Sequence, residues 1–209
     1  MKVNDVTQAD NSTLEQKVTL RYTALKQITN PVVLETHGGW GEIFAAAYGH
    51  IRQGVVLEKD PQKAEYLARQ RPTWAVYEGD SAAALSLGAG AHLVTNVLDI
   101  DPYGDPWPVI QAYFRSARQM ADSMVVVVND GLRQMVRTGT SWQSNSLSPI
   151  VAEWGNDLFG RYLEVCEELM RRSVLPADYH MTFFDGYHTG HSGSMTHYLA
   201  VLEKQKTTG

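Results

Sequence analysis

The sequence contains a single cysteine, Cys166, among 209 residues. One cysteine excludes a disulfide within the chain and a metal site built from several cysteines, and it fits a reducing compartment. Leu163, Leu169 and Met170 lie at helical spacings from Cys166, so we expect this side chain to pack in the core.

Long apolar runs are also missing. No run approaches the roughly 20 residues that a membrane-spanning helix needs, and the opening MKVNDVTQADNST lacks the apolar segment of a signal peptide. We therefore expect a cytoplasmic protein without a membrane partner.

Positive charge is not in excess either, since 18 Lys and Arg stand against 23 Asp and Glu, giving a net charge of −5. This balance argues against a broad nucleic-acid-binding surface, although a local basic patch is compatible with it.

The composition is that of an ordinary globular domain, with 44% hydrophobic and 20% charged residues. A chain of this length fits a single domain spanning 1–209. Residues 1–11 are predicted to be a loose tail. Residues 130–150, which are rich in Ser, Thr, Gly and Asn, are predicted to be an insertion loop.

Strands alternate with helices along most of the chain. The predicted strands are 32–35, 54–58, 74–77, 92–98, 124–128, 179–184 and 195–203. The predicted helices are 12–27, 42–51, 62–69, 82–87, 108–121 and 150–172. The first helix is expected to bury the face formed by Leu14, Val18, Tyr22 and Leu25.

The run MVVVV at 124–128 suggests a strand buried on both faces, and the glycine-rich link between the last two strands suggests a hairpin. We predict an α/β fold with a doubly wound, seven-stranded sheet. Its strands should be mostly parallel, with an antiparallel C-terminal hairpin.

A glycine cluster follows the first strand, with Gly38, Gly39 and Gly41. Ligands of doubly wound sheets bind at the carboxyl ends of the strands. A dinucleotide fingerprint counted from Gly39 would place its third glycine at Phe44, and no Lys-Ser or Lys-Thr pair follows the glycines. A nucleotide-dependent oxidoreductase is therefore disfavoured, and a ligand without phosphate fits better.

S-adenosylmethionine (SAM) is such a ligand, with an ammonium, a carboxylate, a sulfonium, a ribose and an adenine. Backbone at Gly39 and Gly41 can approach it closely, and the helix that starts near Gly41 favours its carboxylate. Glu35 can reach the ammonium, Glu58 the ribose hydroxyls and Asp80 the adenine amine. Each acid could instead only cap a helix, but three acids and a glycine turn in this order favour SAM.

Residues Glu35 to Gly41, Glu58 and Asp80 resemble the cofactor motifs of class I SAM-dependent methyltransferases. The resemblance covers roughly residues 30–203 and implies a Rossmann-like methyltransferase fold with SAM as cofactor. His37 stands where the family usually has glycine, so it would crowd the turn or contact a bound molecule. Glu35 stands where aspartate is more common.

The stretch LDIDPYGDPW, residues 98–107, follows the fourth strand. Methylation of an amine needs a hydrogen-bond acceptor that points the nitrogen lone pair at the methyl group, and an aromatic ring can stack on a base. Asp101 and Tyr103 can supply these groups. The alternative is a simple proline-glycine turn.

The motif resembles that of the tRNA N2,N2-dimethylguanosine methyltransferase family, which reads Asp-Pro-Phe-Gly. The resemblance implies that Asp101 is the catalytic carboxylate, Tyr103 the stacking aromatic and Asp99 a neighbour of the cofactor. It also implies that the acceptor is a nucleobase, such as guanine in RNA. The acidic charge keeps two alternatives open: a small-molecule methyltransferase, and a methyltransferase-like protein that binds SAM without catalysis.

Four histidines cluster around the last hairpin: His180, His188, His191 and His197. Two imidazoles in one turn could bind a metal ion, but no third ligand stands at a fixed spacing. We therefore predict no metal site and interpret these histidines as contacts to the substrate.

Overall fold

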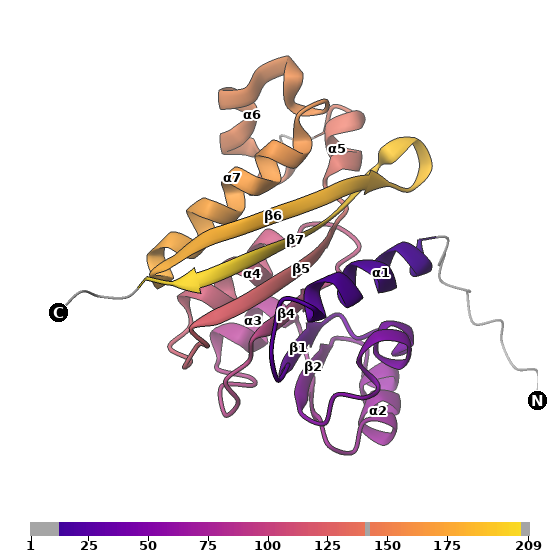
Figure 1. Cartoon of the computed structure of the whole chain (residues 1–209). Coiled ribbons are helices and arrows are strands. Elements are labelled where there is room, and N and C mark those ends of the chain that lie inside the picture. The colour runs from indigo at the N-terminus through magenta and orange to yellow at the C-terminus, as the bar shows by residue number, and fades with distance from the viewer. Residues whose placement is uncertain (1–12, 141–142, 206–209) are drawn as a thin grey trace, which may run out of the picture.

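The computed structural model describes residues 13–140 and 143–205, which form a seven-stranded sheet in the order β3-β2-β1-β4-β5-β7-β6 (Figure 1). The strands are β1 (Val33–Thr36), β2 (Gly54–Glu58), β3 (Ala75–Glu78), β4 (Val97–Ile100), β5 (Ser123–Asp130), β6 (Tyr179–Thr189) and β7 (Met195–Lys204). The first five strands are parallel, and β7 inserts antiparallel between β5 and β6. The predicted fold class is confirmed.

Helices cover both faces of this sheet. The α-helices are α1 (Leu14–Leu25), α2 (Pro61–Gln70), α3 (Ser81–Ser86), α4 (Trp107–Arg115), α5 (Arg133–Arg137), α6 (Ser148–Trp154) and α7 (Tyr162–Val174). Short helical turns are η1 (Phe44–Tyr48), η3 (Gly155–Leu158), η4 (Leu175–Ala177) and η5 (His191–Gly193). In Figure 1, α1 crosses the near face, and α3 and α4 lie behind the sheet.

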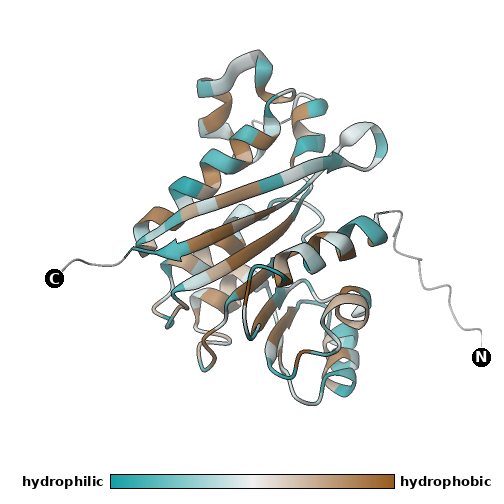
Figure 2. Cartoon of the chain, viewed as in Figure 1, coloured by the Kyte–Doolittle hydropathy of each residue, from teal (hydrophilic) through white to brown (hydrophobic). Residues whose placement is uncertain are grey.

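The core is divided by the sheet into two layers. In β5, Val125 and Val127 pack on the side of α1, while Met124, Val126 and Val128 pack on the side of α4 and α7. Figure 2 shows the central strands as the most hydrophobic part of the chain. Each fully buried side chain of this size contributes about 1.5–3 kcal/mol. Cys166 lies in the second layer, fully buried, as predicted.

The buried face of α1 differs from the expected one. Tyr22, expected in the core, is 47% exposed, whereas Leu20, Arg21 and Ala24 are buried, with Lys17 half-buried on the same face. The prediction from hydrophobic periodicity missed this face because two of its residues, Lys17 and Arg21, are cations. Their burial is compensated by acids of the sheet.

Several predicted boundaries are wrong. The strand expected at 92–98 begins only at Val97. Just before it, Asn96 Oδ1 accepts a hydrogen bond from Val32 N–H at 2.8 Å, which joins the segments that lead into β4 and β1. The helix expected at 108–121 is α4, which ends at Arg115. The helix expected at 150–172 is divided into α6, η3 and α7, and Gly155, with φ of +58°, ends α6.

Residues 130–150 are not a plain loop, because they contain the end of β5, all of α5 and the start of α6. The final hairpin is longer than predicted. Gly186 lies within β6, where a Cβ would stand 2.6 Å from Tyr198 Cβ, so a glycine allows the two strands to pair there.

The predicted tail at 1–11 lies outside the described residues. Across the described ranges, no helix is long and apolar enough to cross a membrane.

Candidate functional site

The turn between β1 and η1 is held by backbone hydrogen bonds, with Gly38 N–H donating to Leu57 O and Gly41 N–H to Gly38 O, at 3.1 and 3.0 Å. A Cβ on Gly38 would lie 2.5 Å from Val56 Cγ2, so this glycine lets the turn pack on β2. A Cβ on Gly39 would meet no atom within 4 Å, and its φ is +54°. The turn is therefore packed on one side and open at Gly39.

Glu58 stands beside this open position at the end of β2. One carboxylate oxygen accepts from Gly39 N–H at 2.7 Å, and the other accepts from Asp60 N–H at 2.9 Å. A carboxylate has about four lone-pair positions. Each oxygen therefore keeps acceptor capacity for hydroxyl groups of a ligand lying over Gly39.

Glu35 lies beneath the turn rather than at its open side. It is 3% exposed, and its carboxylate accepts a hydrogen bond from Arg71, whose guanidinium packs over the ring of Phe44 with its central carbon 4.1 Å from the ring centroid. Burial raises the pKa of Glu35 to about 7, despite the attraction of Arg71. The Nε and Nη2 atoms of Arg71 are buried without a hydrogen-bond partner in the described part of the chain.

His37 and Asp80 complete the surroundings of the turn. His37 has a φ of +61°, which explains why glycine suits this position, and its Nδ1 lies 3.0 Å from Thr36 Oγ1. Burial lowers the pKa of His37, against the opposing attraction of Asp101, Glu58 and Asp80. Asp80 is exposed and caps α3 by accepting from Ala83 N–H at 3.0 Å.

Asp99 is buried within β4, in register with Glu35 of β1. Its two oxygens accept from Arg21 of α1 at 2.5 and 2.9 Å, and one also accepts from the Tyr48 hydroxyl at 2.7 Å. The Arg21 side chain has no exposed surface and also donates to Asn129 Oδ1 at 3.1 Å. This buried network joins α1, η1, β4 and β5.

Asp101 lies just beyond the end of β4, and both of its oxygens accept from Lys17 Nζ, at 2.8 and 2.9 Å. Burial would raise the pKa of Asp101, but Arg21 and Lys17 outweigh it and hold the pKa below its usual value. Tyr103, two residues on, is 94% exposed. The DPYG turn thus presents an ionised carboxylate next to a solvent-facing aromatic ring.

Two polar side chains close to Asp101 carry buried nitrogen atoms without hydrogen-bond partners. Asn129 Nδ2 and both ring nitrogens of His197 are buried, and no hydrogen bond to them exists within residues 13–140 and 143–205. Asn129 and His197 are opposite each other on β5 and β7. Burial, followed by the charges of Arg21 and Lys17, lowers the pKa of His197 to about 4, so the ring is neutral at pH 7.

Asp130 ends β5 and points to the other face of the sheet. It accepts from Leu132 N–H at 2.7 Å and from the Tyr162 hydroxyl at 3.1 Å, and Cys166 Sγ lies 3.6 Å away. Burial raises the pKa of Asp130 to about 7. This acid is fully enclosed by α5 and α7.

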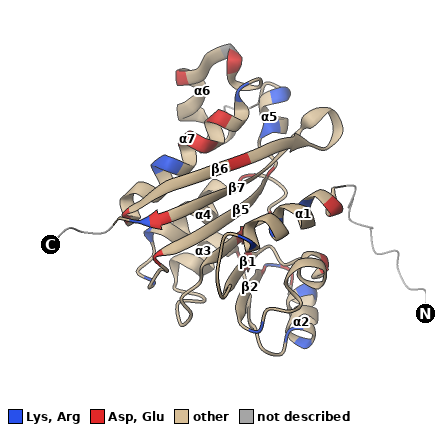
Figure 3. Cartoon of the chain, in the orientation of Figure 1, with Lys and Arg blue, Asp and Glu red and all other residues tan. Residues whose placement is uncertain are grey.

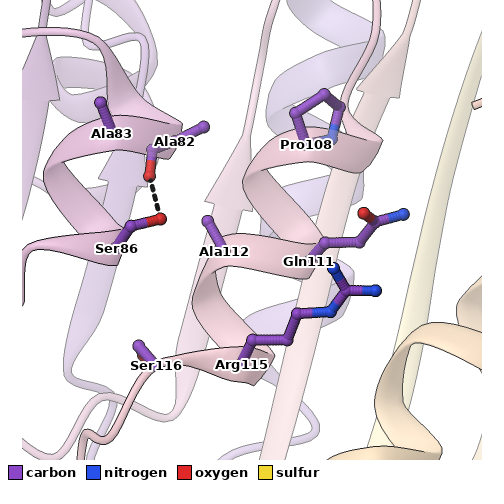
Figure 4. Close-up of a pocket in the computed structure, with 8 residues that line it drawn as sticks. All are labelled: Ala82, Ala83, Ser86, Pro108, Gln111, Ala112, Arg115 and Ser116. Carbon is purple, nitrogen blue, oxygen red and sulfur yellow. Dashed lines mark hydrogen bonds between the residues drawn. The ribbon is translucent and has the colours of Figure 1, made fainter. Parts of the chain in front are cut away.

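A groove of about 430 Å³ runs between α3 and α4 (Figure 4). It is lined mainly by small side chains, with Gln111 and Arg115 at one side, and Ser86 Oγ donates to Ala82 O at 2.9 Å. None of the predicted site residues lines this groove, so we do not assign the ligand site there.

The structure brings the predicted residues to one edge of the sheet, but in two different settings. Gly39, Gly41, Glu58, His37 and Asp80 surround the glycine turn. The acids Glu35, Asp99 and Asp101 face the side of α1, each paired with a cation that the sequence did not single out: Arg71, Arg21 and Lys17. The i, i+4 spacing of Lys17 and Arg21 was the available signal.

The sheet order, the antiparallel β7 and the glycine turn after β1 define a Rossmann-like methyltransferase fold. No protein-family model matches the sequence, and a search of curated proteins finds no match.

Solved structures share the fold. Trm1 from Pyrococcus horikoshii, solved with S-adenosyl-L-methionine, has a TM-score of 0.65 and 10% identity, covering 93% of this chain. The alignment spans 55% of Trm1, so this chain corresponds to about half of that protein. TYW2 from M. jannaschii, in complex with AdoMet, has a TM-score of 0.61 and 13% identity over 95% of this chain and 78% of TYW2.

The N-methyltransferase NodS from Bradyrhizobium japonicum, in complex with S-adenosyl-L-homocysteine (SAH), has a TM-score of 0.58 and 10% identity. That alignment covers 92% of this chain and 87% of NodS. At these identities the likeness establishes the fold.

Proposed function

We propose that this protein is a SAM-dependent methyltransferase that transfers a methyl group to an amine. The observation that carries the proposal is the glycine turn, where Gly39 leaves open space and the Glu58 carboxylate is fixed beside it by two backbone N–H groups. Similar folds solved with SAM or SAH support the same ligand.

The residues of the turn fit the parts of SAM. Glu58 accepts the ribose hydroxyls with its remaining lone pairs, and Asp80, which is exposed at the start of α3, meets the adenine amine. Gly39 and Gly41 let the backbone approach the methionine part, and His37 borders it. Glu35 and Asp99 support the site from beneath through Arg71 and Arg21, because both carboxylates are already paired there.

The acceptor lies at the DPYG turn in this proposal. SAM supplies a methyl group on a sulfonium, which is already an activated donor. Asp101 accepts a hydrogen bond from the acceptor amine and turns its lone pair toward the methyl group, and Tyr103 stacks on the acceptor ring. The nitrogen–carbon bond forms as the carbon–sulfur bond breaks, SAH leaves, and the proton lost by the methylated nitrogen passes to solvent. Positioning provides most of the rate acceleration.

The proposed acceptor is a nucleobase, with RNA as the first candidate because of the DPYG motif and the exposed Tyr103. Figure 3 shows charges of both signs mixed over the view, including paired residues along α7, rather than a broad basic surface. The net charge of −5 therefore favours a small-molecule amine as the second candidate.

The test is incubation of the purified protein with isotopically labelled SAM and separate pools of RNA, DNA and metabolites, followed by mass spectrometry. We expect label on an amine nitrogen of RNA. The variant Asp101→Asn should lose transfer by at least about 100-fold while its SAH affinity stays within about threefold.

Asp122→Asn is the matched control, because Asp122 is an exposed acid at the opposite end of β5. It should leave transfer unchanged. Binding of SAH without transfer to any pool would contradict the enzymatic proposal and favour a non-catalytic SAM-binding protein.

A further inference from the structure

The contact between Asp101 and Lys17 differs from the other acid–base pairs of the site. The side chains of Lys17 and Asp101 are 18% and 17% exposed, whereas those of Arg21 and Asp99 are 0% and 1% exposed. A lysine at the edge of the solvent can leave its partner at little cost, but a fully buried arginine cannot. Lys17 is therefore the exchangeable partner of Asp101.

Asn129 adds an unfilled donor beside the same carboxylate. Its Oδ1 accepts from Arg21, which fixes the orientation of the amide and turns Nδ2 away from Arg21. The Asn129 amide is close enough to the Asp101 carboxylate for a weak hydrogen bond that helps to lower the pKa of Asp101. This contact lies outside ordinary hydrogen-bond geometry within the described ranges, so Nδ2 keeps donor capacity for a better acceptor. A buried N–H without a partner costs about 1–3 kcal/mol, so a ligand that accepts from it is favoured.

His197, opposite Asn129 on β7, repeats this pattern because neither ring nitrogen has a partner in the described chain. The neighbouring strands β5 and β7 thus each carry a buried polar side chain near Lys17 that has a hydrogen-bonding atom without a partner. In the cluster of Asp101, Asn129 and His197, some buried hydrogen-bonding atoms have no partner. A packed core pairs such atoms, whereas a binding site leaves them for a ligand.

Building on the proposed methyltransferase function, we propose that Lys17 occupies the acceptor's place on Asp101. The acceptor that displaces it is an uncharged, planar amine with a hydrogen-bond acceptor atom next to the amino group. The amino group donates to Asp101, and the neighbouring atom accepts from Asn129 Nδ2. Lys17 is then a positioning residue that keeps Asp101 ionised and oriented until the acceptor arrives.

The absence of charge on the acceptor follows from the chemistry of Asp101. An alkylammonium would fit the carboxylate as Lys17 does, but it must lose a proton before its nitrogen can attack. Arg21 and Lys17 hold the pKa of Asp101 low, so this carboxylate is a weak base. An exocyclic amine of a heteroaromatic ring carries no such proton at pH 7.

The test is to titrate nucleosides into ¹⁵N-labelled protein that is saturated with SAH. The nucleosides differ in whether they carry an exocyclic amine. Adenosine, cytidine and guanosine carry an exocyclic amine, whereas inosine and uridine lack it, and saturating SAH keeps adenosine out of the cofactor site. The side-chain amide signal of Asn129 is the readout. At least one amine-bearing nucleoside should shift it with an affinity about tenfold above that of its matched control.

Variants separate Lys17 from a merely structural residue. Lys17→Met should tighten binding of that nucleoside by about three- to tenfold, because the competing ammonium is gone, whereas Lys17→Arg should not. Asn129→Asp keeps the oxygen for Arg21 but removes the donor, so it should weaken binding by about tenfold or more.

The inference is overturned if SAH binds and no nucleoside shifts the Asn129 signal in the wild type or in Lys17→Met. The unfilled groups would then be satisfied by water, and the proposed function would stand. If SAH itself fails to bind, the proposed function fails first.

Discussion

The two turns at the carboxyl edge of the sheet are built in contrasting ways. The glycine turn is held by its own backbone and by Glu58, 19 positions from Gly39. The DPYG turn depends on α1, since Arg21 bonds Asp99 across 78 positions and Lys17 bonds Asp101 across 84. The cofactor half of the proposed site is therefore local, whereas the acceptor half depends on long-range ion pairs.

The largest expected loss of stability comes from removing the buried, long-range ion pair that supports the acceptor half of the proposed site. Arg21→Met leaves the buried Asp99 carboxylate without its cation, so unfolding free energy in urea should fall by about 3–5 kcal/mol. Lys17→Met is the matched control on the same helix and should cost at most about 1 kcal/mol, because its pair is partly exposed. Equal losses for the two variants would contradict the distinction between a fixed and an exchangeable cation.

A smaller effect is expected from the local half. Gly38→Ala places a Cβ 2.5 Å from Val56 Cγ2 and 2.8 Å from Leu67 Cδ1, so overpacking should cost about 1–3 kcal/mol of stability. Gly104→Ala in the DPYG turn meets no atom within 4 Å and should change stability by less than about 0.5 kcal/mol. Thermal unfolding of both variants checks this difference, which would vanish if the glycine turn were loosely packed.

Gly39→Ala should separate stability from binding. Its φ of +54° makes alanine strained by about 1 kcal/mol. The added methyl group would also project into the open space that the proposed cofactor site assigns to the ligand, so the Kd for SAH should rise by about tenfold or more. An unchanged SAH affinity in the folded variant would place the ligand elsewhere.

The fold was largely predictable because its signals are local. The valines of β5 and the order of strands and helices predicted the sheet, and the glycines with Glu58 predicted an open turn with an acid beside it. Boundaries failed at single residues: Gly155, with a φ of +58°, ends α6, and the Asn96 side chain bonds Val32 N–H just before β4.

The partners of the predicted acids were not predictable in the same way. Asp99 and Asp101 were found from a short motif, but Arg21 and Lys17 lie far away in sequence on a helix whose apolar residues suggested a different buried face. Ion pairs between residues far apart in sequence depend on the tertiary fold, so the hydrophobic periodicity of α1 alone does not predict them.

A separate expected effect concerns the pH dependence of stability. Asp130 has a folded-state pKa of about 7, above its ordinary value, because of burial. The native state therefore retains this proton longer than the unfolded chain, and its contribution to stability is lost as pH rises from about 4 to 7. Asp130→Asn should reduce the pH dependence of urea unfolding measured from pH 5 to 8, and should leave the part that Glu35, whose pKa burial also raises to about 7, contributes with the same sign. A wild-type slope retained in the variant would assign it to other groups.

The most direct measurement is calorimetric titration of the purified protein with SAH, compared with Glu58→Gln. We expect saturable binding at one site per chain in the wild type, weakened by about tenfold or more in Glu58→Gln, which loses a charged acceptor while keeping the same shape. No binding by the wild type, or equal affinity in both proteins, would contradict the assignment of the glycine turn as the cofactor site.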